Sequence, residues 1–138
     1  MYLLDTNVVS ELRKPKPHGA VVAWLTSIDA ADLYLSVVTV GEIQDGIELT
    51  RDQDAKKAEL IESWLERITE TYSVLPMDAA TFRAWARLMH RRSDTLLYED
   101  AMIAATARIH NLTVVTRNVS DFAQFDVQVL NPFESATR

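Results

Sequence analysis

The chain has 138 residues, of which 48% are hydrophobic and 25% are charged, and this is typical of a single globular domain spanning residues 1–138. It has no cysteine, which excludes a disulfide scaffold, a cysteine-ligated zinc site and thiol catalysis, and neither a dinucleotide fingerprint nor a P-loop can be built from its three glycines. The net charge of −6 argues against nucleic-acid binding by bulk charge, so such contacts would need a few placed arginines, or acids that bind a metal.

The chain alternates short apolar runs with longer amphipathic segments. Strands are predicted, in chain order, at Tyr2–Leu4, Leu33–Leu35, Ser73–Pro76, Leu112–Thr116 and Val127–Leu130. Helices are predicted between them at Val38–Leu49, Asp54–Tyr72, Asp78–Arg92 and Tyr98–His110, with Asp78 as an N-cap and Asn111 as a left-handed C-cap. This alternation is typical of an α/β fold in which helices cover both faces of a parallel sheet.

Four acidic residues fall where predicted strands end or predicted helices begin. Asp5 ends the first strand, and Asp121 follows the fourth. Glu42 and Asp100 lie in the first turns of helices. Taken singly, each is more simply explained as a cap, a partner of the helix dipole or a turn residue. Together they fall on one edge of a parallel sheet, where four carboxylates repel one another unless a cation binds, and oxygen-only ligands favour Mg²⁺ or Mn²⁺ over zinc.

Five blocks of the sequence resemble the motifs of one known family, in the right order along the chain. They are Leu4–Leu12, Glu42–Ile47, Asp100–Ala107, the stretch from Thr116 to Phe122, and Val129–Phe133. These blocks are similar to those of PIN-domain ribonucleases, and they most resemble the VapC and FitB toxins of bacterial toxin–antitoxin pairs. The resemblance covers essentially the whole chain.

The resemblance implies a three-layer α/β sandwich around a parallel PIN-like sheet of four or five strands. It also implies a Mg²⁺-dependent endoribonuclease in which Mn²⁺ can substitute. The residues that match the family's metal ligands are Asp5, Glu42 and Asp100, with Asp121 as a fourth acid that often acts through water. Thr6 and Asn118 match supporting polar neighbours of the metal.

One residue departs from the family pattern. Glu99 stands where small or apolar residues are more usual, and we choose Asp100 as the ligand because it continues into the familial Ala-Met-Ile-Ala-Ala run. With this ligand set, Asp121 or Asp100 would orient or deprotonate a water for in-line attack on phosphorus. Hydrolysis of this kind leaves a 5′-phosphate and a 3′-hydroxyl.

The cations near the first and fourth strand ends are candidates for contacts with RNA phosphates. Arg117, between Thr116 and Asn118, is the preferred contact, although it could instead pair with an acid of the site. Arg13 and Lys14 follow Asp5 in a basic loop, for which a solvated turn is an equally good interpretation.

The resemblance also implies partners. Members of the family usually form homodimers and bind a small, DNA-binding antitoxin of the VapB or FitA type. By analogy, residues around Val8–Leu12 and Ile43–Leu49 would contribute to the groove for the antitoxin. No direct DNA binding by this acidic chain is expected. No apolar run approaches the ~20 residues of a membrane span and no secretory signal is visible, so we expect a cytoplasmic protein that does not contact membranes.

Two alternative functions share part of this pattern. A response-regulator receiver also combines alternating strands and helices with an acidic Mg²⁺ site, but it needs a lysine after a late strand. The lysines of this chain are Lys14, Lys16, Lys56 and Lys57, and none follows a late strand. A PIN fold that binds RNA or a partner without cutting is the closer alternative, and the presence of all four acids argues against it. Transfer, ribosomal and messenger RNA all stay open as the target.

Overall fold

A computed structural model describes residues 1–92 and 97–134 of the chain. Its centre is a five-stranded parallel sheet in the order β3-β2-β1-β4-β5. The strands are β1 (Tyr2–Leu4), β2 (Leu33–Ser36), β3 (Ser73–Leu75), β4 (Thr113–Val115) and β5 (Val129–Leu130). The central strand is therefore the first in the sequence, and Leu4 at its end pairs with Leu35 and Val115. This register brings the carboxyl ends of β1, β2 and β4 to one edge of the sheet.

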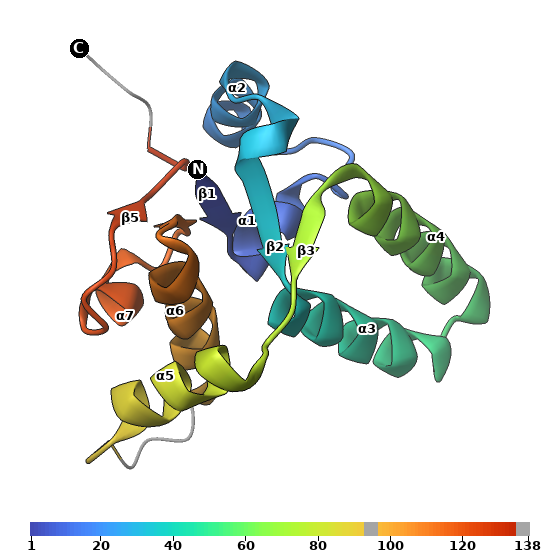
Figure 1. The fold of residues 1–138 in the computed structure, drawn as a ribbon. Coiled ribbons are helices and arrows are strands. Elements are labelled where there is room, and N and C mark those ends of the chain that lie inside the picture. Colours follow the sequence, from blue (N-terminus) through green and yellow to red (C-terminus); the bar gives the residue numbers. More distant parts are fainter. Residues whose placement is uncertain (93–96, 135–138) are drawn as a thin grey trace.

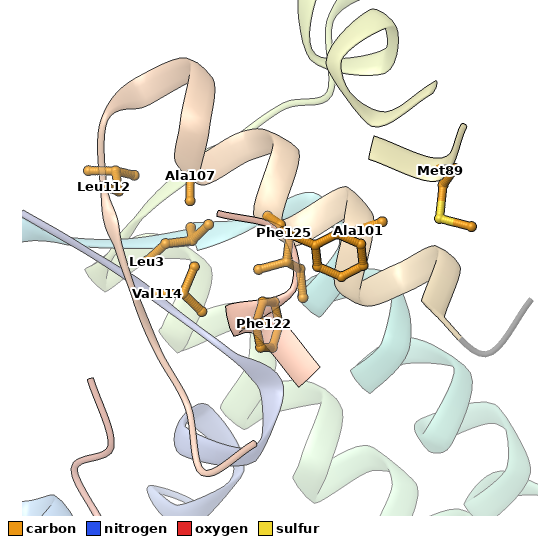
Figure 2. Close-up of a cluster of buried hydrophobic side chains, with 10 residues drawn as sticks. Leu3, Met89, Ala101, Ala107, Leu112, Val114, Phe122 and Phe125 are labelled. Carbon is orange, nitrogen blue, oxygen red and sulfur yellow. The ribbon is translucent and has the colours of Figure 1, made fainter. Parts of the chain in front are cut away.

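Helices cover both faces of the sheet and complete the predicted three-layer sandwich (Figure 1). They are α1 (Thr6–Glu11), α2 (Gly19–Ser27), α3 (Val37–Arg51), α4 (Ala55–Thr71), α5 (Ala79–Met89), α6 (Tyr98–His110) and α7 (Val119–Ala123), with a 3₁₀ turn at Ala30–Asp32. Leu3 faces α5, α6 and α7, whereas Leu4 faces α1, α2 and α4, because successive side chains of a strand point to opposite faces. Figure 2 shows the first of these two clusters, in which Phe122 of α7 packs close to Leu3 and Val114.

The helix ends follow local sequence signals. Ser36 and Asp54 cap α3 and α4 by accepting hydrogen bonds from the backbone N–H groups of Val38 and Lys57. The predicted cap of α5 is also confirmed, since the Asp78 carboxylate accepts from the N–H of Thr81 at 2.9 Å. The last turn of α6 ends at Asn111 in the left-handed conformation, with φ 59°, as predicted.

Three features of the fold depart from the sequence predictions. The segment after His18 forms α2, which was not predicted because its apolar residues are consecutive and lack helical periodicity. Asp121 lies in the short helix α7 and not in a loop turn, since five residues are too few to show a period. Helix α5 ends at Met89, where the prediction ran to Arg92. In the described part of the chain, no helix has both the length and the apolar character needed to cross a membrane.

The strand order excludes the receiver-domain alternative. Receiver domains have the flavodoxin-like order 2-1-3-4-5. Here β1 is central, between β2 and β4, and β3 forms an outer edge beside β2.

Candidate functional site

Asp5 is the buried centre of the acidic edge. It is 5% exposed and follows β1, where its backbone N–H donates to the carbonyl of Val115 at 2.9 Å. One carboxylate oxygen, Oδ1, caps α1 by accepting from the N–H of Thr6 at 2.8 Å. The other oxygen, Oδ2, accepts from Thr116 Oγ1 at 2.8 Å and Asn7 Nδ2 at 3.1 Å. Burial raises the pKa of Asp5 while these three donors oppose the rise, and repulsion from Asp121 adds to it.

Glu42 reaches the same edge from α3. Thr6 Oγ1 donates to Glu42 Oε1 at 2.8 Å and lies 3.2 Å from the hydroxyl oxygen of Thr39, which is fully buried one turn before Glu42. Thr6 therefore joins the start of α1 to the first turns of α3, and it places the Glu42 carboxylate beside the end of β1. The predicted supporting residue Thr6 contacts one of the predicted acids directly.

Glu99 also contributes to the site, although the sequence pattern favoured its neighbour Asp100. Desolvation and a hydrogen bond between the carboxyl groups of Glu99 and Glu42 are the main causes that raise the pKa of Glu42 to about 8. Repulsion from Glu99 and from Asp5 raises it further. The only sequence signal for Glu99 is its position next to Asp100 at the start of α6.

Asp100 and Asp121 complete the acidic edge from the starts of α6 and α7. Both lie in the first turn of their helices, and neither helix has a side-chain cap. Burial, followed by repulsion from Asp5, Asp121 and Glu99, raises the pKa of Asp100 to about 6. The structure thus brings the four sequence-predicted acids, Asp5, Glu42, Asp100 and Asp121, to the same edge, together with Glu99.

The donor set of this edge is suited to a hard divalent cation. It consists of carboxylate and hydroxyl oxygens. Burial is the main cause that raises the pKa values of Asp5, Glu42 and Asp100, repulsion between the acids adds to it, and a bound cation would favour the charged carboxylates. In residues 1–92 and 97–134, no group of three or more histidine or acidic side chains has the spacing of a finished metal site.

Two polar residues for which the sequence predicts no role, Asn7 and Thr116, link the acids to the sheet. Asn7 Nδ2 bridges Asp5 and Thr116 Oγ1, while its Oδ1 accepts from the backbone N–H of Arg117 at 3.1 Å. Thr116 Oγ1 also accepts from the N–H of Asn118 at 3.0 Å. The predicted supporting residue Asn118 contributes this backbone contact, and its side chain does not cap α7. In the sequence, the only signal for Asn7 and Thr116 is that each lies within a longer family-like motif.

The three candidate RNA-binding cations have different surroundings. Lys14 forms an ion pair with Glu11, a carboxylate that is 4% exposed and also accepts from the N–H of His18. Arg13 lies in the groove described below. The guanidinium of Arg117 stacks on the ring of Phe133, at 3.9 Å from its centroid, so the alternative in which it pairs with an acid of the site is not what the structure shows.

A two-part groove runs between α1, α3 and α4 and ends beside the acids. The outer part, about 330 Å³, is lined by four apolar and three basic residues: Leu12, Leu60, Ile61 and Trp64, with Arg13, Lys57 and Arg67. The inner part, about 260 Å³, includes Thr6, Glu42 and Ile43 and shares Arg13, Ile61 and Trp64 with the outer part. The segments Val8–Leu12 and Ile43–Leu49, which the family resemblance implies as parts of a partner groove, both contribute residues to the groove described here.

Comparisons with known proteins agree with this geometry. The family model described as the PIN domain matches residues 2–128. The chain is 38% identical to Toxin FitB from Neisseria gonorrhoeae over 96% of this chain and 99% of that protein. It is 35% identical to VapC ribonuclease Y4jK from Sinorhizobium fredii over 99% and 100% of the two chains.

Solved structures give the same result. The crystal structure of FitAcB from Neisseria gonorrhoeae superposes with a TM-score of 0.84 and 38% identity, over 96% of this chain and 99% of that chain. The structure of FitAB bound to IR36 DNA fragment superposes with a TM-score of 0.85 and 36% identity, over 99% of both chains. The chain therefore belongs to the PIN-domain family, among its FitB-like and VapC-like members.

Proposed function

We propose that this protein is a divalent-metal-dependent endoribonuclease that acts as the toxin of a toxin–antitoxin pair. The observation that carries the proposal is the gathering of Asp5, Asp100 and Asp121, from three separate elements, close enough to repel one another at the carboxyl edge of the sheet. Uncompensated repulsion of this kind lowers the stability of the fold, and clusters of ionisable groups with shifted pKa values are typical of active and binding sites. The relative named as a VapC ribonuclease, matched over its whole length, supports the choice of RNA.

In this proposal Asp5, Glu42 and Asp100 hold the ion. Mg²⁺ or Mn²⁺, when bound, supplies positive charge that polarises the phosphodiester and makes a neighbouring water more acidic. Thr6 orients Glu42 by donating to its Oε1, and Asn7 with Thr116 orients Asp5 by donating to its Oδ2, because these hydrogen bonds hold each carboxylate in one orientation.

Asp121 is exposed and serves as the proton acceptor in the proposed reaction. Its carboxylate takes a proton from the attacking water as the water oxygen bonds to phosphorus. The bond between phosphorus and O3′ then breaks, O3′ takes a proton from solvent water to leave as a hydroxyl, and Asp121 returns its proton to the solvent. The products are a 5′-phosphate and a 3′-hydroxyl.

The test is cleavage of an RNA oligonucleotide by purified protein, with and without EDTA. Asp100→Asn should lower cleavage at least about a hundredfold, since an amide oxygen is a poor replacement for a carboxylate beside a hard cation. Asp126→Asn is the matched control, because Asp126 is almost fully exposed and asparagine tolerates its positive φ of 55°. Cleavage that survives EDTA would contradict the metal requirement. RNA binding without cleavage by the parent protein would instead favour the non-catalytic alternative.

The groove between α1, α3 and α4 is the proposed seat of a small antitoxin. Leu60 on its wall is 72% exposed, and Lys57 and Arg67 beside it are complementary to an amphipathic partner segment with acidic residues. The solved relatives FitAcB and FitAB superpose over nearly the whole chain, which supports a partner of this kind.

The groove is tested by co-expressing this chain with the product of an adjacent small reading frame. Leu60→Glu should abolish co-purification and release RNA cleavage. Ile109→Glu, at another exposed apolar site on the last turn of α6, should leave the complex intact. Equal loss in both variants would contradict the assignment of the groove. The homodimer is tested by the sedimentation of the protein alone.

A further inference from the structure

The guanidinium of Arg117 is held by an aromatic ring. Its central carbon lies 3.9 Å from the centroid of the Phe133 ring, which is within the range of a cation–π interaction. Across residues 1–92 and 97–134, no carboxylate lies within 4.0 Å of it, and none of its side-chain N–H groups donates a hydrogen bond. A stacked guanidinium keeps its N–H donors free at its edge, and these donors are suited to phosphate oxygens.

The main chain of Arg117 is fixed to the acidic edge. Its backbone N–H donates to Asn7 Oδ1 at 3.1 Å, and Asn7 Nδ2 donates to Asp5 Oδ2 at 3.1 Å. The preceding residue, Thr116, donates to the same oxygen of Asp5 at 2.8 Å. Two hydrogen bonds therefore separate the backbone of Arg117 from the central acid, and the stacking on Phe133 determines where its long side chain lies.

Phe133 is itself held firmly. Its N–H donates to Asn131 Oδ1 at 2.9 Å, and its half-buried ring packs against the apolar cluster of α1, α2 and β1. The ring of His18 meets it edge-on, with the centroids 5.2 Å apart. Because β5 is parallel to β4, the segment after β5 starts at the same edge of the sheet as Arg117. The ring is thus a fixed platform, built from the other end of the chain.

The charge of this edge makes such a cation valuable for RNA binding. Five carboxylates gather there and repel the phosphates of an RNA chain. Lys14 is already paired with Glu11, and Arg13 lies in the groove assigned to the antitoxin. Arg117 combines an anchored backbone at the acids with side-chain donors that are not engaged.

We infer that Phe133 is a positioning residue for RNA binding. Its ring holds the Arg117 guanidinium where it binds a backbone phosphate that flanks the scissile one. The inference rests on the proposed ribonuclease function and adds to it a role for the segment that follows the last strand.

The test is a double-mutant cycle on cleavage of an RNA oligonucleotide in Mg²⁺. Arg117→Gln should raise KM about tenfold with kcat nearly unchanged, and Phe133→Leu should raise KM about two- to fivefold, as expected for the loss of one cation–π contact. Phe133→Tyr, which keeps the ring face, should behave like the parent. In the Arg117→Gln background, Phe133→Leu should change nothing further. Arg108→Gln removes the same charge in the last turn of α6, at the end of the helix away from Asp100, and should leave KM unchanged.

A binding measurement separates this inference from the proposed function. The cleavage-deficient Asp100→Asn protein is titrated with the same RNA by fluorescence anisotropy at several salt concentrations. Arg117→Gln should lower the slope of log Kd against log salt by about 0.7, which corresponds to one lost phosphate contact with a single strand. Phe133→Leu should lower the slope by a smaller amount, and thermal melts should show that it folds. If it does not fold, Phe133→Met takes its place, because methionine fills the apolar space without a ring.

Two results would overturn the inference. One is that Phe133→Leu raises KM or Kd equally with Arg117 present and absent, since this would make the ring a support of the fold alone. The other is that Phe133→Leu leaves RNA binding and its salt dependence unchanged. A parent protein that binds RNA through Arg117 but fails to cut it would refute the proposed function and leave the positioning role supported.

Discussion

The repulsion among the acids predicts that removing one charge stabilises the metal-free protein. Asp100 is the best place to test this, because it is half-buried and accepts no hydrogen bond from other residues in the described part of the chain. Its folded-state pKa of about 6 exceeds the ordinary 3.8, so folding favours the protonated form. Its contribution to stability is therefore present at low pH and is lost as the pH rises through 6. Above pH 7 the ionised carboxylate destabilises the metal-free fold.

The magnitude follows from the pKa. A rise from 3.8 to about 6 corresponds to about 3 kcal/mol for a fully buried group, and solvent screening of this half-buried carboxylate reduces it to about 1 kcal/mol. For a chain of 138 residues, about 1 kcal/mol corresponds to a change in Tm of roughly 3–4 °C. Asp100→Asn should thus raise Tm by this amount in EDTA at pH 7.5. The difference should vanish near pH 4, where Asp100 is also neutral.

Thermal melts between pH 4 and 8 in EDTA test this prediction. Asp5→Asn provides a contrast, because Asp5 accepts three hydrogen bonds and an amide would turn an N–H₂ group towards one of those donors. That variant should gain little or lose stability. Asp126→Asn should melt like the parent throughout. A difference between Asp100→Asn and the parent that does not depend on pH would refute the reasoning from repulsion.

Three further predictions concern the same edge. Glu99→Gln should raise Tm in EDTA at pH 8 and not at pH 4, because it removes the carboxylate that repels Glu42. Affinity for Mn²⁺, measured by calorimetry, should weaken as the pH falls from 8 to 5, since protons compete for Glu42 and Asp100; a constant affinity would place the ion elsewhere. Asn7→Ala should lower stability by about 1–2 kcal/mol in denaturant melts and reduce cleavage about tenfold, because Asp5 and Thr116 lose their bridge; unchanged cleavage would make Asn7 purely structural.

The sequence predicted the layers and the acidic edge because their signals are local. Apolar runs locate the strands. Asp5 is recognised by its position directly after β1, and Asp121 by its place in the polar segment that follows β4. The short helices α2 and α7 escaped prediction, since one lacks apolar periodicity and the other is too short to show any.

The contacts that hold the side chains of the site could not be predicted in this way. Thr116 meets Asp5 across 111 positions of sequence, and Asn7 meets Arg117 across 110. The stacking of Arg117 on Phe133 depends likewise on two strands becoming neighbours in the sheet. No local sequence pattern predicts such pairings. The sequence therefore left an RNA phosphate and an acid of the site as possible partners of Arg117, and the structure shows it stacked on Phe133.

The most direct test of the central claim is to cut RNA in water enriched in ¹⁸O, with Mg²⁺ present, under single-turnover conditions. If the acids hold an ion that activates water, mass spectrometry should find one ¹⁸O atom in the 5′-phosphate of the downstream product and an unlabelled 3′-hydroxyl upstream. Asp100→Asn should give no product, and Asp126→Asn should give the labelled product at the parent's rate. A 2′,3′-cyclic phosphate with a 5′-hydroxyl, or an unlabelled 5′-phosphate, would contradict hydrolysis at this carboxylate edge.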